Sequence, residues 1–299
     1  MATKLDGILA RMHDMGAENV RREFIGMIYG DPGAGKTHLA MGLAQKLRKG
    51  GDIILLDSSD GWVSLAGKDM LTKNARRLQV QKPDDLPLIA NAIEKRQKGF
   101  ENVSVVILDE GSSIANDILE TVVRQRAGAS ESDVLPEIEG RDYGPAGQIF
   151  VSMISKFHRI EGLHLIIVAH NREKTEDGSI ALVNRPMFPP LLLTNLMAKM
   201  HVVAFVTARR KADNTYVREV QAQPSATVRA KSRINDMQVK TGFGPFGTTI
   251  TNWVVSDSFE SDLAGEEAQA VVSEDEEETE IPDSDEIEDT DESADELDV

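Results

Sequence analysis

The segment GDPGAGKT, from Gly30 to Thr37, combines three glycines, a lysine and a hydroxyl at the spacing G-x-x-x-x-G-K-[ST]. Glycine lets successive backbone N–H groups turn inward around an anion. In this pattern the lysine reaches the β- and γ-phosphates of a nucleotide, and the hydroxyl ligates Mg²⁺. A helix that begins at Lys36 adds the positive end of its dipole. The segment therefore predicts a site for a nucleoside triphosphate, namely ATP with magnesium.

The residues expected to line this site run from the end of one strand into the first turn of a helix. They are Gly30, Asp31, Pro32, Gly33, Ala34, Gly35, Lys36, Thr37 and His38. The alternative is a glycine-rich turn that has a lysine beside it by chance. The apolar run from Phe24 to Tyr29 predicts a strand before the turn, and Leu39, Leu43 and Leu47 predict a helix after it. Both flanking elements favour the phosphate site over the alternative.

An acidic motif, VSVVILDE, spans Val103 to Glu110 and is typical of a Walker B strand. We expect Asp109 to hold the magnesium ion through a bound water. We expect Glu110 to orient or deprotonate the water that attacks the γ-phosphate. The alternative is a buried strand followed by an acidic helix cap.

Short apolar runs alternate with helical patterns along the first 170 residues. Strands are predicted at 24–29, 53–56, 103–108 and 163–169, and helices at about 36–50, 84–98, 114–124 and 147–160. This alternation predicts an α/β fold in which helices flank a mostly parallel sheet. Ligands of such sheets bind at the carboxyl ends of the strands, where Gly30, Asp57, Asp109, Glu110 and His170 all fall.

Beyond His170 the pattern changes. Asn171 to Pro190 is expected to be a long polar loop, and residues 202–207 and 216–220 are expected to form an antiparallel hairpin that extends the sheet. Tyr143, which precedes one predicted helix, either stacks on adenine or belongs to the core.

Charge is distributed unevenly along the 299 residues, whose net charge is −17. Residues 256–299 hold 21 of the 50 acidic residues and no Lys or Arg, which leaves 33 basic and 29 acidic residues, a net of +4, before them. We expect this acidic tail to be disordered, because it has too few apolar residues to form a core. Its role is open between solubilisation, mimicry of DNA that competes for the basic body, and docking of a protein partner.

The remaining bulk features exclude several classes of protein. The chain has no cysteine, which excludes disulfides, thiolate zinc sites and cysteine nucleophiles. The sequence shows no signal peptide and no membrane span, which predicts a cytoplasmic protein. We divide the chain into an N-terminal helix (1–20), an ATPase domain (21–255) and the acidic tail (256–299).

From Phe24 to Gly247 the sequence resembles the RecA superfamily, and within it the phage-type RecA-like ATPases of single-strand annealing and recombination. Besides the two nucleotide motifs, the segments that carry the resemblance are RDYGPAGQIF (141–150), LIIVAHNRE (165–173) and VRAKSRI (228–234). The resemblance implies a cytoplasmic location in a bacterial host, a ring or filament of identical subunits, and single-stranded DNA as a partner.

The resemblance also implies roles for particular residues. His170 would sense the γ-phosphate, and Lys231 and Arg233 would enter the ATP site of a neighbouring subunit. The loop from Asn171 to Pro190 would bind DNA. Phosphate contacts there would come from basic side chains, with one aromatic ring to stack on a base. These residues are Arg172, Lys174, Arg185 and Phe188. The alternative is an ordinary mobile loop.

Two departures keep other functions open. Ser59 stands where the RecA-like family often has a glutamate, so either Glu110 or Asp60 activates water, or hydrolysis is slow. The Asp-Glu motif and the segment GKTHLA also resemble AAA-type helicase loaders. A protein-remodelling ATPase and a weakly hydrolysing nucleotide-binding regulator are therefore the alternatives to a DNA-recombination ATPase.

Overall fold

The computed structural model describes residues 23–175, 182–212 and 214–255. The N-terminal helix predicted for residues 1–20 and the acidic tail predicted for residues 256–299 lie outside these ranges. In the described ranges, no helix is both long enough and apolar enough to cross a membrane.

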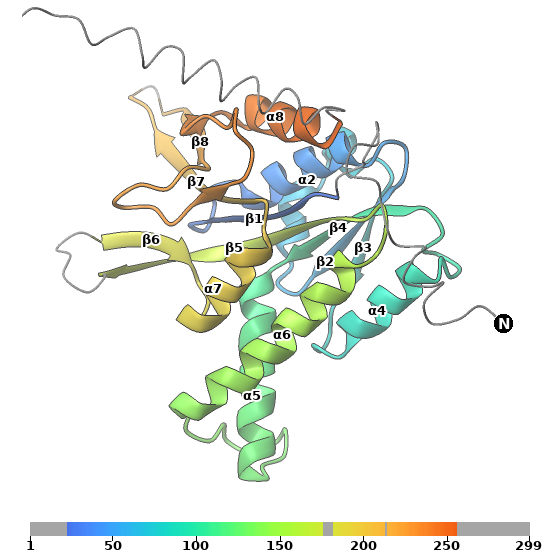
Figure 1. The fold of residues 1–299 in the computed structure, drawn as a ribbon, viewed down its shortest axis with the longest axis vertical. Helices are drawn as coiled ribbons and strands as arrows, with labels where there is room; N and C mark the ends of the chain where they lie inside the picture. The colour runs from blue at the N-terminus through green and yellow to red at the C-terminus, as the bar shows by residue number, and fades with distance from the viewer. Residues whose placement is uncertain (1–22, 176–181, 213, 256–299) are drawn as a thin grey trace, which may run out of the picture. The chain divides into compact units, whose positions relative to one another are not determined.

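A single ten-stranded sheet forms the centre of the described part, with the main strand order β10-β8-β7-β1-β5-β4-β2-β3 (Figure 1). Six neighbouring strands run parallel: β1 (Ile25–Gly30), β2 (Asp52–Asp57), β3 (Ala75–Gln79), β4 (Val103–Asp109), β5 (His164–Thr175) and β7 (Val202–Arg210). Four strands pair antiparallel to their neighbours: β6 (Leu182–Pro186), β8 (Tyr216–Gln221), β9 (Lys231–Ser232) and β10 (Lys240–Thr241). The predicted fold class is confirmed.

Helices cover both faces of the sheet (Figure 1). One face carries α4 (Asp85–Glu94), α5 (Gly111–Ala127), α6 (Tyr143–His158) and α7 (Pro190–Lys199). The other face carries α2 (Lys36–Leu47) and α8 (Phe243–Val255). Three short helical segments complete the described part: η1 (Gly61–Leu65), α3 (Asp69–Thr72) and η2 (Gly140–Asp142).

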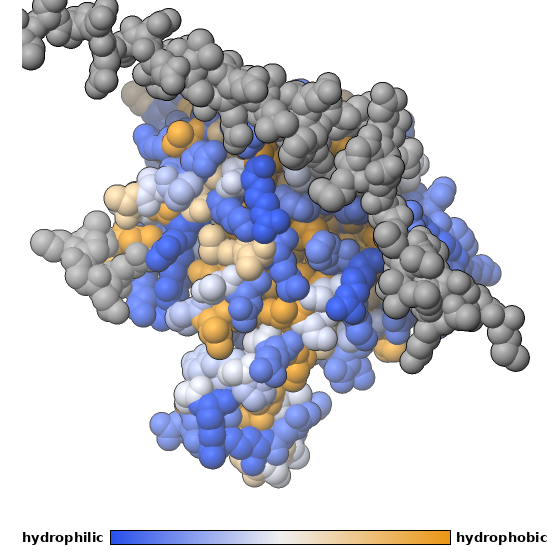
Figure 2. Space-filling view, in the orientation of Figure 1, coloured by the Kyte–Doolittle hydropathy of each residue, from blue (hydrophilic) through white to orange (hydrophobic). Residues whose placement is uncertain are grey.

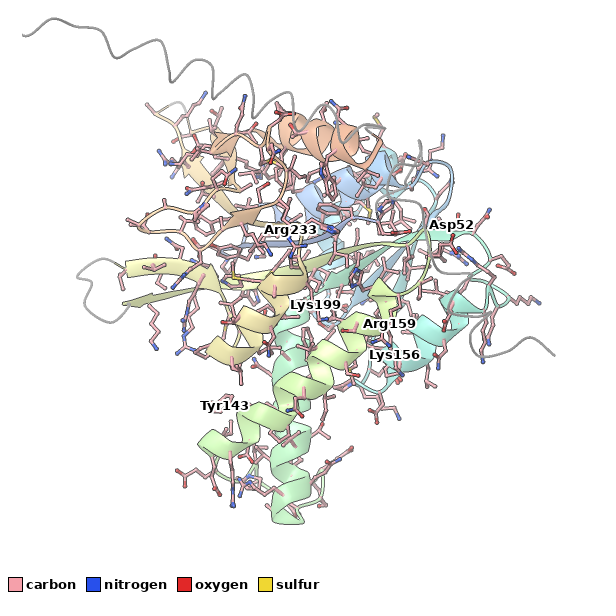
Figure 3. All side chains as sticks on the ribbon, in the orientation of Figure 1. Asp52, Tyr143, Lys156, Arg159, Lys199 and Arg233 are labelled. Carbon is pink, nitrogen blue, oxygen red and sulfur yellow. The ribbon has the colours of Figure 1, made fainter. Side chains whose placement is uncertain are left out.

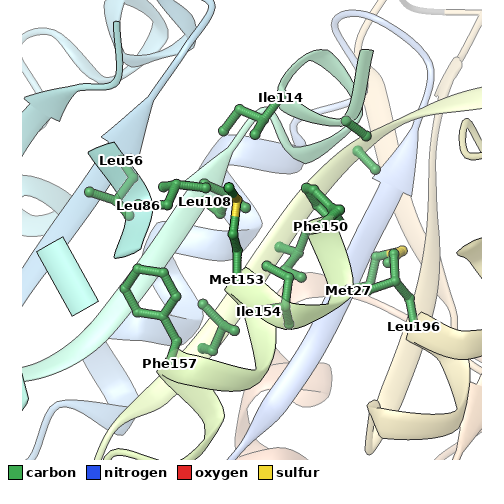
Figure 4. Packing of buried hydrophobic residues seen from close by; sticks show 14 of the residues in the cluster. Met27, Leu56, Leu86, Leu108, Ile114, Phe150, Met153, Ile154, Phe157 and Leu196 are labelled. Carbon is green, nitrogen blue, oxygen red and sulfur yellow. The ribbon is translucent and has the colours of Figure 1, made fainter. Parts of the chain in front are cut away.

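Alternating side chains of the buried strands supply two hydrophobic cores. On β1, Met27 points into the core beneath α6 and α7, whereas Ile28 points into the core beneath α2. Figure 4 shows the first of these cores, where Phe150 and Phe157 of α6 pack over the sheet. Burial on both faces explains why these strands are continuous apolar runs and not alternating patterns. The two cores hold the carboxyl ends of the strands in fixed positions.

The structure corrects the sequence-based prediction in several places. The segment from Asn171 to Pro190 is not one long loop, because β5 continues to Thr175 and pairs with β6. Strand β3 was missed because its sequence, ARRLQ, is polar and half exposed at the edge of the sheet. Helices α7 and α8 were also missed, although each buries one apolar face.

Candidate nucleotide site

The phosphate loop connects the end of β1 to the start of α2. Gly30 ends β1, and a Cβ at this position would collide with the Val206 carbonyl of β7. Gly33 and Gly35 have φ values of 77° and 95°, which glycine adopts without strain. Gly35 is the N-cap of α2, so the unpaired N–H groups of the first helical turn follow it directly. The loop therefore offers a run of N–H groups suited to an anion.

Lys36 lies inside this loop and is only 8% exposed. Its ammonium donates a hydrogen bond to the Asp31 carbonyl oxygen at 3.1 Å. Burial lowers the pKa of Lys36, while the charges of Glu110, Asp109 and Asp31 act in the opposite direction. The lysine thus sits among acidic groups from the loop and from the end of β4.

Thr37 and Asp109, the predicted magnesium ligands, come together from two different elements. The Thr37 hydroxyl donates to Asp109 Oδ2 at 2.9 Å. Burial raises the pKa of Asp109 to about 6, and the hydrogen bond from Thr37 opposes that rise. Magnesium takes hard oxygen ligands and completes its shell with water and phosphate oxygens, so this hydroxyl and carboxylate fit it. No cluster of three or more His, Cys, Asp or Glu that could hold a metal occurs in the described ranges.

Glu110 lies at the start of α5, in contact with two polar groups. Its Oε2 pairs with Nε2 of His170, and its Oε1 accepts a hydrogen bond from Ser112 Oγ at 2.9 Å. Ser112 Oγ also accepts a hydrogen bond from the His170 backbone N–H at 3.1 Å. Burial raises the pKa of Glu110 to about 7. Burial, aided by the positive charge of Lys36, lowers the pKa of His170.

The end of β2 adds a further buried carboxylate. Asp57 is fully buried and in register with Asp109 on the neighbouring strand. Arg77 donates to Asp57 Oδ2 at 2.7 Å and also pairs with Asp60. The side chain of Asp60 is 70% exposed and held in this ion pair. Glu110, by contrast, is buried among the site residues, so the geometry favours it over Asp60 as the group that activates water.

Strand β5 continues from the site into the hairpin that it forms with β6, which carries three of the residues predicted to bind DNA. Arg172 and Lys174 lie on β5 and are exposed, and Arg185 lies on β6. Arg172 and Arg185 are direct cross-strand partners, and like charges in such positions repel. Arg185 Nε is buried without a hydrogen-bond partner among the described residues. An anion beside the hairpin would relieve both costs.

Asn171 links this hairpin to the phosphate loop. Its side-chain Nδ2 donates to Asp31 Oδ1 at 2.9 Å and to Asn184 Oδ1 at 2.7 Å. Asp31 belongs to the phosphate loop and Asn184 to β6. One side chain on β5, between His170 and Arg172, therefore connects both parts.

The structure contradicts the proposed base-stacking role of Phe188. Phe188 is 2% exposed, and its ring packs on Phe150 with the ring centroids 5.7 Å apart. Its ring is therefore part of the core. Tyr143 is not part of the core, because it is 42% exposed at the start of α6 (Figure 3). It lines a cavity of about 790 Å³ with Arg172, and Figure 2 shows hydrophobic and hydrophilic residues side by side over α6 and α7.

Lys231 and Arg233 lie at the opposite end of the sheet from the phosphate loop of their own chain. Lys231 pairs with Val203 near the start of β7, whereas the loop follows the end of β1. Lys231 Nζ donates to the Met197 carbonyl at 2.6 Å, and Arg233 donates to the Ala198 carbonyl at 2.7 Å. Both cations thus satisfy carbonyl groups in the last turn of α7, and Figure 3 shows Arg233 and Lys199 near that helix end. The structure does not bring them to the site residues.

Sequence reasoning missed the polar residues that connect the site. Ser112 contacts both Glu110 and His170, and Asn171 joins the loop to the hairpin. A signal was available for each, because Ser112 stands two residues after the acidic motif and Asn171 directly follows His170. Neither residue type is specific enough to predict such contacts without the strand order.

Comparisons with known proteins agree with the nucleotide motifs. A family model described as AAA domain matches residues 22–234. No curated protein matches the chain. Among solved structures, the flagellar accessory protein FlaH from Methanocaldococcus jannaschii is 15% identical, with a TM-score of 0.37, over 73% of this chain and 83% of that one. The RadB recombinase is 12% identical, with a TM-score of 0.39, over 75% of this chain and 88% of that one. Likenesses at these scores carry no weight for function.

Proposed function

The chain belongs to the AAA domain family, and from this premise we propose that it is a magnesium-dependent, RecA-like ATPase that acts on single-stranded DNA. Phage-type annealing or recombination is the process that we infer from the sequence resemblance. The support for ATP hydrolysis is the group of side chains that β1, β4 and β5 bring to one edge of the sheet.

Each of these side chains has a distinct role in the proposed reaction. Lys36 would bind the β- and γ-phosphates, and Thr37 and Asp109 would hold a magnesium ion, which would supply charge neutralisation of the phosphates when bound. Glu110 accepts the proton of the attacking water, and its raised pKa suits a base that works near neutral pH. His170 pairs with Glu110, so it would position that base, and the resemblance implies that it would also sense the γ-phosphate.

The observation that carries the link to DNA is the pair of hydrogen bonds made by Asn171. They connect the phosphate loop to a hairpin in which Arg172 faces Arg185, and among the described residues Arg185 Nε is buried without a hydrogen-bond partner. Phosphates of single-stranded DNA would supply that anion, with Lys174 contributing a further contact. DNA held by the hairpin would thereby influence the nucleotide site through one side chain.

The test is ATP hydrolysis measured with and without single-stranded DNA, at fixed salt and at several protein concentrations. We expect DNA to stimulate hydrolysis by the wild-type protein. Arg172→Ala should weaken DNA binding, whereas Asn171→Ala should reduce the ratio of stimulated to unstimulated activity. Lys156→Ala, which removes an exposed cation from α6, is the matched control and should change neither property.

The alternative proposal is a remodelling ATPase or helicase loader that acts on a protein partner, and membership of the AAA domain family supports it as well. If DNA does not change the rate of ATP hydrolysis and no variant binds DNA, the results favour this alternative. Slow hydrolysis under all conditions would favour a nucleotide-binding regulator. Either result would refute the proposal of a DNA-recombination ATPase.

Assembly into a ring or filament remains a proposal that rests on the resemblance. Lys231 and Arg233 lie far from the loop of their own chain, so only the site of another copy is open to them. Their hydrogen bonds to α7 would have to break for that role. A rise in hydrolysis per subunit with protein concentration tests this proposal.

A further inference from the structure

A cation of the same chain lies over the phosphate loop, on the hairpin formed by β7 and β8. Arg218 pairs with Ala208 of β7, two residues beyond Val206, which is in register with Gly30 at the end of β1. The hairpin therefore projects past the end of β1 on the side where the phosphate loop begins. Helix α8 lies against both α2 and β8, so the hairpin and the loop share a packed support (Figure 1).

Arg218 approaches the loop where Gly35 leaves the backbone uncovered. A Cβ at Gly35 would lie 2.9 Å from Arg218 Nε and 3.0 Å from its Cδ. The Phe243 ring, at the start of α8, would lie 3.4 Å from the same point. Gly35 is the N-cap of α2, so the guanidinium and the ring flank the helix end that supplies N–H groups to an anion.

The surroundings of Arg218 are positively charged. His38 follows the loop and contacts Lys68. Burial lowers the pKa of His38, and the charges of Lys68 and Arg218 lower it further, which places all three groups together. The side chain of Arg218 is exposed and forms no ion pair with another residue of the described ranges, in contrast to Arg209 on the same hairpin. Cations next to the positive end of a helix are unfavourable unless an anion binds between them.

On the opposite face of the same hairpin, Arg209 has a carboxylate partner. Arg209 is in register with Val217, so its side chain alternates with that of Arg218, and it pairs with Glu219 at 3.6 Å. The hairpin thus neutralises one arginine and leaves the other beside the phosphate loop.

We propose that Arg218 binds the phosphate chain of the nucleotide in cis, on the side of the loop formed by Gly35 and His38. This inference rests on the proposed nucleotide site and adds a binding residue to it. Arginine suits the task, because its planar guanidinium can donate two parallel hydrogen bonds to phosphate oxygens. The charge comes from the chain that holds the loop, so this contact does not require a neighbouring subunit.

The experiment compares two ligands, magnesium-ATP and magnesium tripolyphosphate, by calorimetric titration at constant ionic strength. Arg218→Ala should bind both ligands about 10- to 100-fold more weakly, the range expected for a lost hydrogen bond to a charged group. Arg218→Lys should recover part of the loss, because it restores the charge but not the paired geometry. Arg209→Ala should bind both ligands as the wild type does.

Three results would overturn the proposal. Unchanged affinity of a folded Arg218→Ala protein would exclude the contact, with thermal unfolding as the check on folding. Loss of ATP affinity with unchanged tripolyphosphate affinity would place Arg218 at the base or ribose instead. Recovery of hydrolysis on mixing Arg218→Ala with Lys36→Ala subunits would show that it acts between chains. Wild-type ATP binding by Lys36→Ala would instead refute the nucleotide site itself, so the two failures are distinguishable.

Discussion

Replacing Glu110 with glutamine should slow ATP hydrolysis and, at the same time, stabilise the ligand-free protein. Burial raises the pKa of Glu110 from an ordinary value of 4.5 to about 7. Below pH 4.5 the carboxyl is neutral in both the folded and the unfolded state. Between pH 4.5 and 7 the folded state holds the proton more tightly, so the free energy of unfolding falls as pH rises. Glutamine cannot ionise, and the variant escapes this loss.

The size of the gain follows from the pKa. Each pH unit is worth about 1.4 kcal/mol, so the ionised carboxylate costs the folded state about 3 kcal/mol at pH 8. For a domain of this size the gain corresponds to a rise in Tm of roughly 5–10 °C. Loss of the base should lower kcat by about 100-fold or more, whereas ATP affinity should persist.

The assay is thermal unfolding of ligand-free wild-type and Glu110→Gln protein at pH 4.5 and pH 8, together with steady-state hydrolysis. Glu94→Gln, on an exposed position of α4, is the control and should leave Tm and kcat unchanged. The reasoning is refuted if Glu110→Gln is no more stable than wild type at pH 8. It is also refuted if the gain is equally large at pH 4.5, because ionisation would then not be its cause.

Three further predictions test other parts of the structure. Lys36→Ala should keep the fold but abolish measurable ATP binding, because under the proposed function the ammonium, which lies inside the phosphate loop, would bind the β- and γ-phosphates. A circular-dichroism melt checks the fold and a titration checks ATP binding; normal binding would contradict the site. Arg233→Ala should lower the stability of α7 by about 1 kcal/mol, since the Ala198 carbonyl loses its hydrogen-bond partner. If mixing this variant with Lys36→Ala subunits restores hydrolysis, Arg233 also acts in the ATP site of a neighbouring subunit, as the resemblance implies. Truncation after Val255 removes 21 acidic residues and should tighten single-stranded DNA binding at low salt, with a gain in affinity that shrinks as the salt concentration rises. Equal affinities of the two proteins throughout a salt titration would show that the tail does not cover the DNA site.

The fold class was predictable because its signal is local. Apolar runs such as Phe24 to Tyr29 and Val103 to Leu108 correspond to β1 and β4, which are buried on both faces. The edge strand β3 was not predictable in this way, since an edge strand needs few apolar residues. The hairpin of β5 and β6 was missed because polar, exposed residues such as Arg172 carry no periodic apolar signal.

In the candidate site, too, the residues within short motifs were predictable from the sequence, whereas the contacts between distant segments were not. The phosphate loop and the acidic motif follow from fixed spacings within short segments, so their residues could be named in advance. Contacts between segments depend on strand order, which a single sequence does not supply. Asn171 meets Asp31, and Arg218 meets Gly35, only because β5 and β7 both lie next to β1. Phe188 shows the opposite error. Its position next to basic residues in the sequence led to the prediction that it stacks on a base, but the structure buries its ring in the core.

The position of Asn171 between His170 and Arg172 has a thermodynamic consequence. Under the proposed function, one strand carries both a nucleotide-side residue and a DNA-side residue, so the two binding equilibria are linked. Linkage is reciprocal: if ATP tightens DNA binding by some factor, DNA tightens ATP binding by the same factor. Hydrolysis would then weaken the hold on DNA without any separate release step. In this reading the lifetime of bound ATP sets how long each subunit stays on the strand.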